Sequence, residues 1–250
     1  MSIRSAVVAS LSLCVAVACG AAQTPGGEPH DMSAAQHDRM ARDERLKAGA
    51  HAAQDDPDAA VTKPNCSDLL GSEVCWSSAT NPTKEHLASA EEHRKRAADH
   101  RAASAALRDA EARACVGIGA HDRDQSPFDH REDIAAVDAL YVGDSDQGNA
   151  AAGGGYVSAA RGGRLEGATV TFRAVSGMTA QWLQRVVDCH LARNAALGFD
   201  VPEMPYCPLV PKNVSAKVSP TATGFVVAIR SDDPNTAKEV LRRARALVGH

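Results

Sequence analysis

The clearest sign of a folded unit in this chain is the stretch Val170-Thr171-Phe172-Arg173-Ala174, in which apolar and polar side chains alternate. A period of two is typical of a strand with one buried face. Helical spacing of apolar residues follows over 179–197, where the first residue is a threonine that can cap the helix. Two more alternating segments lie at 214–218 and 225–229, and Asp233 with the proline after it predicts the start of a last helix.

The predicted order βαββα places an α+β domain at residues 166–250. Such an order fits a small sandwich in which helices cover one face of an antiparallel sheet. The pattern resembles a ferredoxin-like unit that lacks one strand. Because that architecture hosts many functions, the resemblance implies a fold and leaves the function open.

A long alanine-rich helix is predicted over residues 82–114, within a largely helical region at 33–142. Asn81 can cap this helix, and Pro82 suits its first position. Alanines recur along it with a seven-residue period, which resembles an alanine-rich coiled coil. We therefore expect it to pair in antiparallel fashion, either within the chain or with another copy.

Histidines follow the same seven-residue period along this helix, at His86, His93 and His100. Residues seven apart lie about 10.5 Å apart along a helix axis, so these three cannot share one ion. A first helix, predicted over 33–53, repeats the spacing with three polar residues in one column: His37, Glu44 and His51. Two interpretations stay open, namely stacked metal sites between the helices or a polar flank that only carries pH-dependent charge.

The remaining segments carry no recognisable catalytic or nucleotide-binding motif. Residues 54–81 read as an irregular connection, and 115–138 as a solvated loop dense in charge. A glycine-rich linker is predicted at 143–165, because its glycines do not have the spacing of a dinucleotide or Walker loop. The mildly acidic net charge of −4 argues against a nucleic-acid partner.

The chain begins with Arg4 followed by an apolar run over Ala6–Ala18. A spanning helix needs roughly 20 apolar residues, so this shorter run predicts a signal peptide at 1–18 that is removed on export. The tetrad Ala16-Val17-Ala18-Cys19 closes the run. It resembles the lipobox of bacterial lipoproteins, although an ordinary secretory cleavage site followed by an incidental cysteine stays open.

The lipoprotein resemblance implies that cleavage precedes Cys19 and that this residue carries the lipid, including palmitate-type acyl chains. Residues 19–32 contain proline and glycine without periodicity and would then form a flexible tether. Because Gly20 stands where the family's inner-membrane signal has an aspartate, the resemblance implies the outer membrane, with the protein facing the periplasm.

Five of the seven cysteines lie beyond this N-terminal segment. An oxidising compartment favours disulfides, and proximity in the sequence suggests Cys66 with Cys75 and Cys189 with Cys207. Cys115 is left without an assigned partner.

A soft-metal site is the competing interpretation of the last pair. Thiolates at Cys189 and Cys207, together with His190 and Met204, are ligand types that suit Cu(I). Disulfide formation and thiolate ligation exclude each other, and the spacing matches no known metal motif. His190 also falls in an apolar helix stripe, where a buried structural histidine is the simpler explanation.

These patterns favour a non-catalytic envelope lipoprotein that acts in interaction or scaffolding, without a cofactor. Its expected partners are the lipid bilayer, through the acylated N-terminus, and a protein or second copy at helix 82–114. The alternatives are a periplasmic copper or zinc binder and, second, a hydrolytic enzyme. No catalytic residue is assigned, because no nucleophile, base and oxyanion donor can be aligned.

Overall fold

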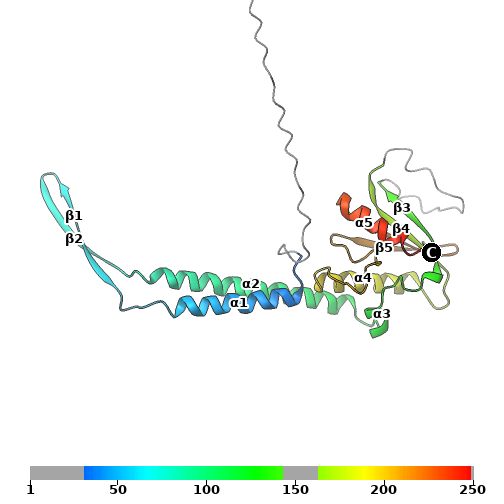
Figure 1. Cartoon of the computed structure of the whole chain (residues 1–250), viewed down its shortest axis with the longest axis horizontal. Helices are drawn as coiled ribbons and strands as arrows, with labels where there is room; N and C mark the ends of the chain where they lie inside the picture. The colour runs from blue at the N-terminus through cyan, green and yellow to red at the C-terminus, as the bar shows by residue number, and fades with distance from the viewer. Residues whose placement is uncertain (1–30, 143–162, 249–250) are drawn as a thin grey trace, which may run out of the picture.

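The computed structural model describes residues 31–142 and 163–248, which form a helical arm and a globular α+β part (Figure 1). The signal peptide, Cys19 and linker residues 143–162 lie outside the described residues. Residue 165 of the expected linker already begins a strand.

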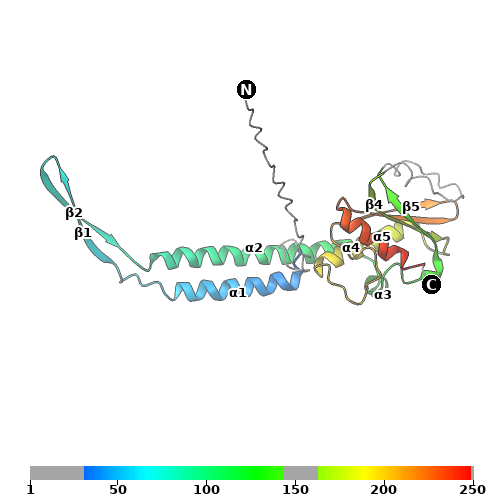
Figure 2. The ribbon, with the colours of Figure 1, turned by 45° about the horizontal axis from the view of Figure 1, so that its top comes forward.

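The arm consists of two antiparallel helices, α1 (Ala34–Ala52) and α2 (Lys84–Ala114), joined by a β-hairpin. The hairpin strands are β1 (Val61–Leu69) and β2 (Ser72–Thr80). Figures 1 and 2 both show this hairpin at the end of the arm farthest from the globular part. We call residues 61–80 the tip.

The tip corrects the expectation of an irregular connection at 54–81. Leu70 and Gly71 both have positive φ, at 55° and 82°, which matches the tight turns that join the strands of a hairpin. The strands contain several β-branched residues, but the apolar side chains are too few to produce the alternation of a half-buried strand.

Small residues set the close approach of α1 and α2. The buried alanines on α1 are Ala34, Ala41 and Ala48, each seven residues apart. Those on α2 have the same period and are Ala90, Ala97 and Ser104. The Ser104 hydroxyl donates to the Ala34 carbonyl at 3.0 Å, which fixes the register of the two helices. The expected antiparallel pairing of the long helix therefore forms within the chain.

The globular part has a four-stranded antiparallel sheet in the order β3-β4-β6-β5. Its elements, with two short helical turns before the first strand, are α3 (Ala120–Asp124), η1 (Arg131–Asp133), β3 (Ile134–Tyr141), β4 (Leu165–Arg173), α4 (Ala180–Ala196), β5 (Ser215–Thr221), β6 (Gly224–Arg230) and α5 (Pro234–Arg245). The expected order βαββα is thus present from β4 to α5.

The structure has strand β3 where a solvated loop was expected up to residue 138, so that expectation is wrong. Its well-buried residues are Ile134 and Leu140, with Val137 half-buried between them. The register of β3 against β4 shifts after Ile134 and again after Leu140. The first shift breaks the period of two between Ile134 and Val137, and Leu140, which pairs with Gly167, points to the opposite face of the sheet from Val137.

Both long helices of the globular part cover the same face of the sheet. Ala168, Val170 and Phe172 of β4 are buried beneath them. Leu183 of α4 and Val240 of α5 belong to the same apolar core. The alternation that predicted this strand therefore reports its buried face correctly.

The arm joins the globular part near the start of α1. Asp31 is buried, and its carboxylate accepts from the Lys212 ammonium at 2.9 Å. Gly198 has a φ of +71° and lies so close to the start of α1 that a Cβ atom added to it would be 2.8 Å from the Ser33 nitrogen. Residue 31 of the expected tether thus packs against the globular part.

Candidate functional site

The helix columns predicted from the sequence come together as one polar seam between α1 and α2. We call this set the seam, and its members are His37, Glu44, His51, His86, His93 and His100. Seven residues forward along α1 match seven residues back along α2, so the seam consists of three facing pairs.

Two of the three pairs are histidine pairs. His37 Nδ1 lies 3.0 Å from His100 Nδ1, and His51 Nδ1 lies 3.3 Å from His86 Nδ1. The His51 ring also stacks on His93, with 5.3 Å between ring centroids and 14° between planes. Nitrogen donors from two helices therefore approach each other at two levels of the arm.

Glu44 and His93 form the middle pair. Glu44 is buried, and its Oε2 lies 2.6 Å from His93 Nδ1 while its Oε1 accepts from Lys47 at 2.6 Å. These hydrogen bonds, that of Lys47 first, lower the pKa of Glu44 to about 2. The seam thus contains an ionised carboxylate between its two histidine pairs.

The tip presents different chemistry from the seam. Of the side chains described in its two strands, only Ser67 and Ser78 are even half-buried. Exposed Val61, Val74 and Trp76 share one face, because residues paired across an antiparallel ladder point the same way. A two-stranded hairpin is marginal in water by itself, so this surface has apolar area still to cover.

Cys66 and Cys75 occupy the opposite face of the tip and form the expected disulfide. Their Cα atoms lie 4.1 Å apart, which identifies a pair without backbone hydrogen bonds between its members. Pro64, two residues away, belongs to the same type of pair, so its nitrogen faces the outer edge of β1. The outer edge of β1 therefore lacks one donor, whereas β2 contains no proline and keeps its edge complete.

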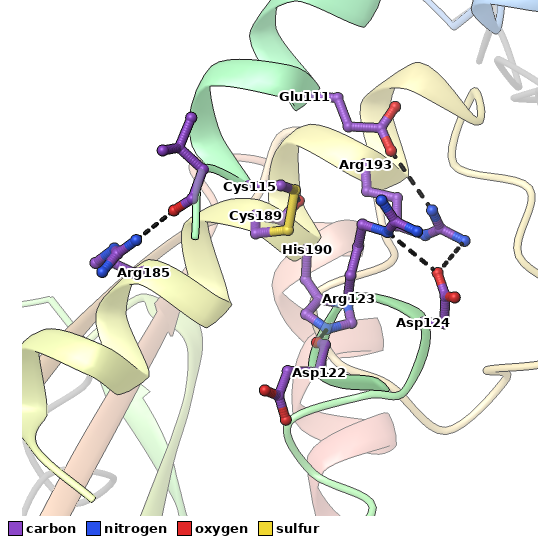
Figure 3. Close-up of a disulfide and its surroundings, with 10 residues drawn as sticks. Glu111, Cys115, Asp122, Arg123, Asp124, Arg185, Cys189, His190 and Arg193 are labelled. Carbon is purple, nitrogen blue, oxygen red and sulfur yellow. Dashed lines mark hydrogen bonds and ion pairs between the residues drawn. A yellow bond between two sulfur atoms is a disulfide. The ribbon is translucent and has the colours of Figure 1, made fainter. Parts of the chain in front are cut away.

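The expected pairing of Cys189 with Cys207 is wrong. Cys115, which follows the last residue of α2, lies over α4 and forms the disulfide with Cys189 (Figure 3). Cys207 is a free thiol buried in the core, where burial raises its pKa. Proximity in the sequence misled the prediction, because α2 and α4 meet only in the folded chain.

Ion pairs accompany this disulfide. Arg193 of α4 lies 3.1 Å from the Asp124 carboxylate and 3.5 Å from that of Glu111, on α2 (Figure 3). Arg185 donates to the Val116 carbonyl on the other side. The end of the arm is thus held to α4 by one covalent and several polar contacts.

The soft-metal set proposed around this region does not assemble as free ligands. Cys189 is oxidised in its disulfide, and Met204 is buried in the apolar core. His190 Nε2 lies 2.9 Å from the Asp122 carbonyl, and its buried Nδ1 has no hydrogen-bond partner among the described residues. Burial lowers the pKa of His190, as expected for a histidine within an apolar stripe.

A small cavity lies between α3 and α4. Titratable groups on its wall include His121, Asp122, His130 and Asp133, beside Trp182. Its volume is about 60 Å³. Organic ligands occupy pockets of roughly 300–1,000 Å³, so this cavity has the size for a few water molecules.

Two groups of potential ligand atoms occur at or near the surface among the described residues. In the first, the sulfur atoms of Cys66 and Cys75 near Glu73 are already joined in the disulfide. The second consists of exposed His130 and Glu132 with half-buried Asp133. No helix among residues 31–142 and 163–248 is long and apolar enough to span a membrane.

Disulfides persist in oxidising compartments, so the two bonds described here indicate an extracytoplasmic protein. No protein family, curated protein or solved structure compared with this chain matches it.

Proposed function

We propose that this protein is a lipid-anchored, non-catalytic interaction module of the cell envelope, which presents its tip to a protein partner. One observation carries the proposal: a disulfide-closed hairpin with exposed Val61, Val74 and Trp76 stands at the far end of a long helical arm (Figure 2).

The tip has the features of a surface built for strand addition. The complete edge of β2 offers backbone donors and acceptors to an extended segment, and main-chain pairing of that kind supplies affinity. Trp76 and Val74 lie on β2 and would pack against alternate side chains of the added strand. The exposed fraction of Trp76, 52%, leaves much of its ring to be covered.

The proposed partner is therefore a protein with an extended apolar segment. A cross-linking amino acid in place of Trp76 should give a discrete product in intact cells. The same amino acid in place of Trp182, an exposed tryptophan on α4, is the matched control and should give none. A product with twice the mass of the chain would identify a second copy as the partner.

Replacing Val61 and Val74 by serine should abolish the product from position 76, because these residues supply the rest of the apolar face. Equal products from positions 76 and 182, or a product unaffected by the serine substitutions, would refute the proposal.

The lipid anchor has its own test. Palmitate labelling and recovery in the membrane fraction should both be lost in Cys19→Ser and kept in Cys14→Ser. Labelling that survives Cys19→Ser would exclude Cys19 as the attachment site.

A further inference from the structure

We infer that the seam binds divalent transition-metal ions, of the Zn²⁺ or Cu²⁺ class, between His51 and His86 and between His37 and His100. This inference rests on the arm alone and does not depend on what the tip binds.

The distances within the two pairs match those between ligands of one ion. Imidazole nitrogens bind Zn²⁺ at about 2.0–2.1 Å, so two of them at a tetrahedral angle stand about 3.3 Å apart. At a right angle the same bonds place them about 2.9 Å apart. The observed Nδ1–Nδ1 distances are 3.3 Å for His51 and His86 and 3.0 Å for His37 and His100.

Each pair takes one ligand from α1 and one from α2, so the backbone already fixes their approach. The Ser104–Ala34 hydrogen bond and the alanine contacts set that approach independently of the histidines. Donors held in place before binding lose little freedom when the ion arrives. Imidazole suits Zn²⁺ and Cu²⁺, and two ligands leave positions for water.

The surroundings position the histidine rings. Glu44, whose other oxygen pairs with Lys47, holds His93 at the middle of the seam through a 2.6 Å contact. His93 in turn stacks on the His51 ring and restricts its orientation. This arrangement fixes the orientation of a ring in the His51–His86 pair, as the groups around a metal ligand commonly do.

Binding requires a proton rearrangement that the seam allows. In the metal-free pair one Nδ1 carries hydrogen and donates to the other, whereas the ion needs both Nδ1 lone pairs. The donor ring therefore changes to its Nε2–H tautomer through exchange with water. No net proton is lost when both rings are neutral.

The test uses full-length protein without an affinity tag. Titration with Zn²⁺ should give two saturable sites, falling to one in His51→Gln/His86→Gln and in His37→Gln/His100→Gln, and to none in the fourfold variant. His121→Gln/His130→Gln removes two exposed histidines elsewhere and should keep both sites. Circular dichroism should show that each variant retains its helices.

Pulsed electron paramagnetic resonance with Cu²⁺ supplies a readout of position. The pairs lie fourteen residues apart along α1, so two bound Cu²⁺ ions should stand about 21 Å apart. Either double variant should remove that distance. Binding that is absent, or that persists in the fourfold variant, would overturn the inference, and loss of one site in only one double variant would overturn it for the other pair.

Discussion

Removing the Cys115–Cys189 disulfide should destabilise the globular part more than any other single cross-link in the described chain. The bond closes a loop of 74 residues, whereas Cys66–Cys75 closes one of 9. If each bond acts by restricting the unfolded chain, the longer loop contributes about 4.4 kcal/mol to the free energy of unfolding at 25 °C, and the shorter loop about 2.6 kcal/mol. We therefore expect Cys115→Ser/Cys189→Ser to lower the free energy of unfolding by up to about 4 kcal/mol.

Guanidinium unfolding followed by tryptophan fluorescence measures this effect. The chain has two tryptophans, so a Trp76→Phe background leaves Trp182 of α4 to report on the globular part. Cys66→Ser/Cys75→Ser is the control, and it should leave the Trp182 transition unchanged, because the tip extends away from the globular part (Figure 1). Peptide mapping of the parent protein should recover Cys115 linked to Cys189.

A loss below about 1 kcal/mol would refute the reasoning, since so small an effect lies outside the usual range for a long closed loop. Recovery of Cys189 linked to Cys207 would refute the connectivity. In Cys115→Ser alone, the Cys207 thiol should stay reduced, because its burial and raised pKa suppress the reactive thiolate.

Three further outcomes follow from the packing. Burial lowers the pKa of His190, so the unfolded state binds a proton more readily than the folded state. The contribution of His190 to the free energy of unfolding should therefore be fully present above about pH 6.5 and be lost as the pH drops below that value. His190→Gln should weaken this pH dependence when unfolding is followed by Trp182 fluorescence. Ala41→Leu should overfill the contact between α1 and α2 and cost about 1–3 kcal/mol in thermal unfolding followed by circular dichroism, whereas Ala102→Leu, on the exposed side of α2, should cost little. Gly167→Ala should disrupt the pairing of β4 with β6, because its Cβ would lie 2.1 Å from the Ile229 carbonyl oxygen. Amide hydrogen exchange in β6 should therefore be faster than in the parent protein, and slower exchange would contradict this expectation.

Local patterns predicted the elements whose buried side chains repeat regularly. Val170 and Phe172 on β4 are an example, and so are the alanines of α2. Strand β3 escaped because its bulges disturb the period, and the tip escaped because it buries almost nothing. Sequence periodicity cannot predict β3 or the strands of the tip, because each of them forms through pairing with a neighbouring strand.

The candidate sites show the same limit. The matching seven-residue columns left open whether His51 and Glu44 would meet the histidines of the second helix, and the structure brings them together. The partner of Cys189 was beyond prediction, because it depends on where the end of α2 meets α4. Contacts between distant segments require the tertiary arrangement, which spacing along the chain does not contain.

The length of α2 amplifies small rotations at its end. Its 31 residues extend about 46 Å, and Cys115, directly after its last residue, is covalently bonded to Cys189 of α4. A swing of only 5° about that pivot would displace the opposite end by about 4 Å, close to the spacing of neighbouring strands. Breaking the bond would thus widen the range of positions that the hairpin takes relative to the globular part, even in molecules that remain fully folded.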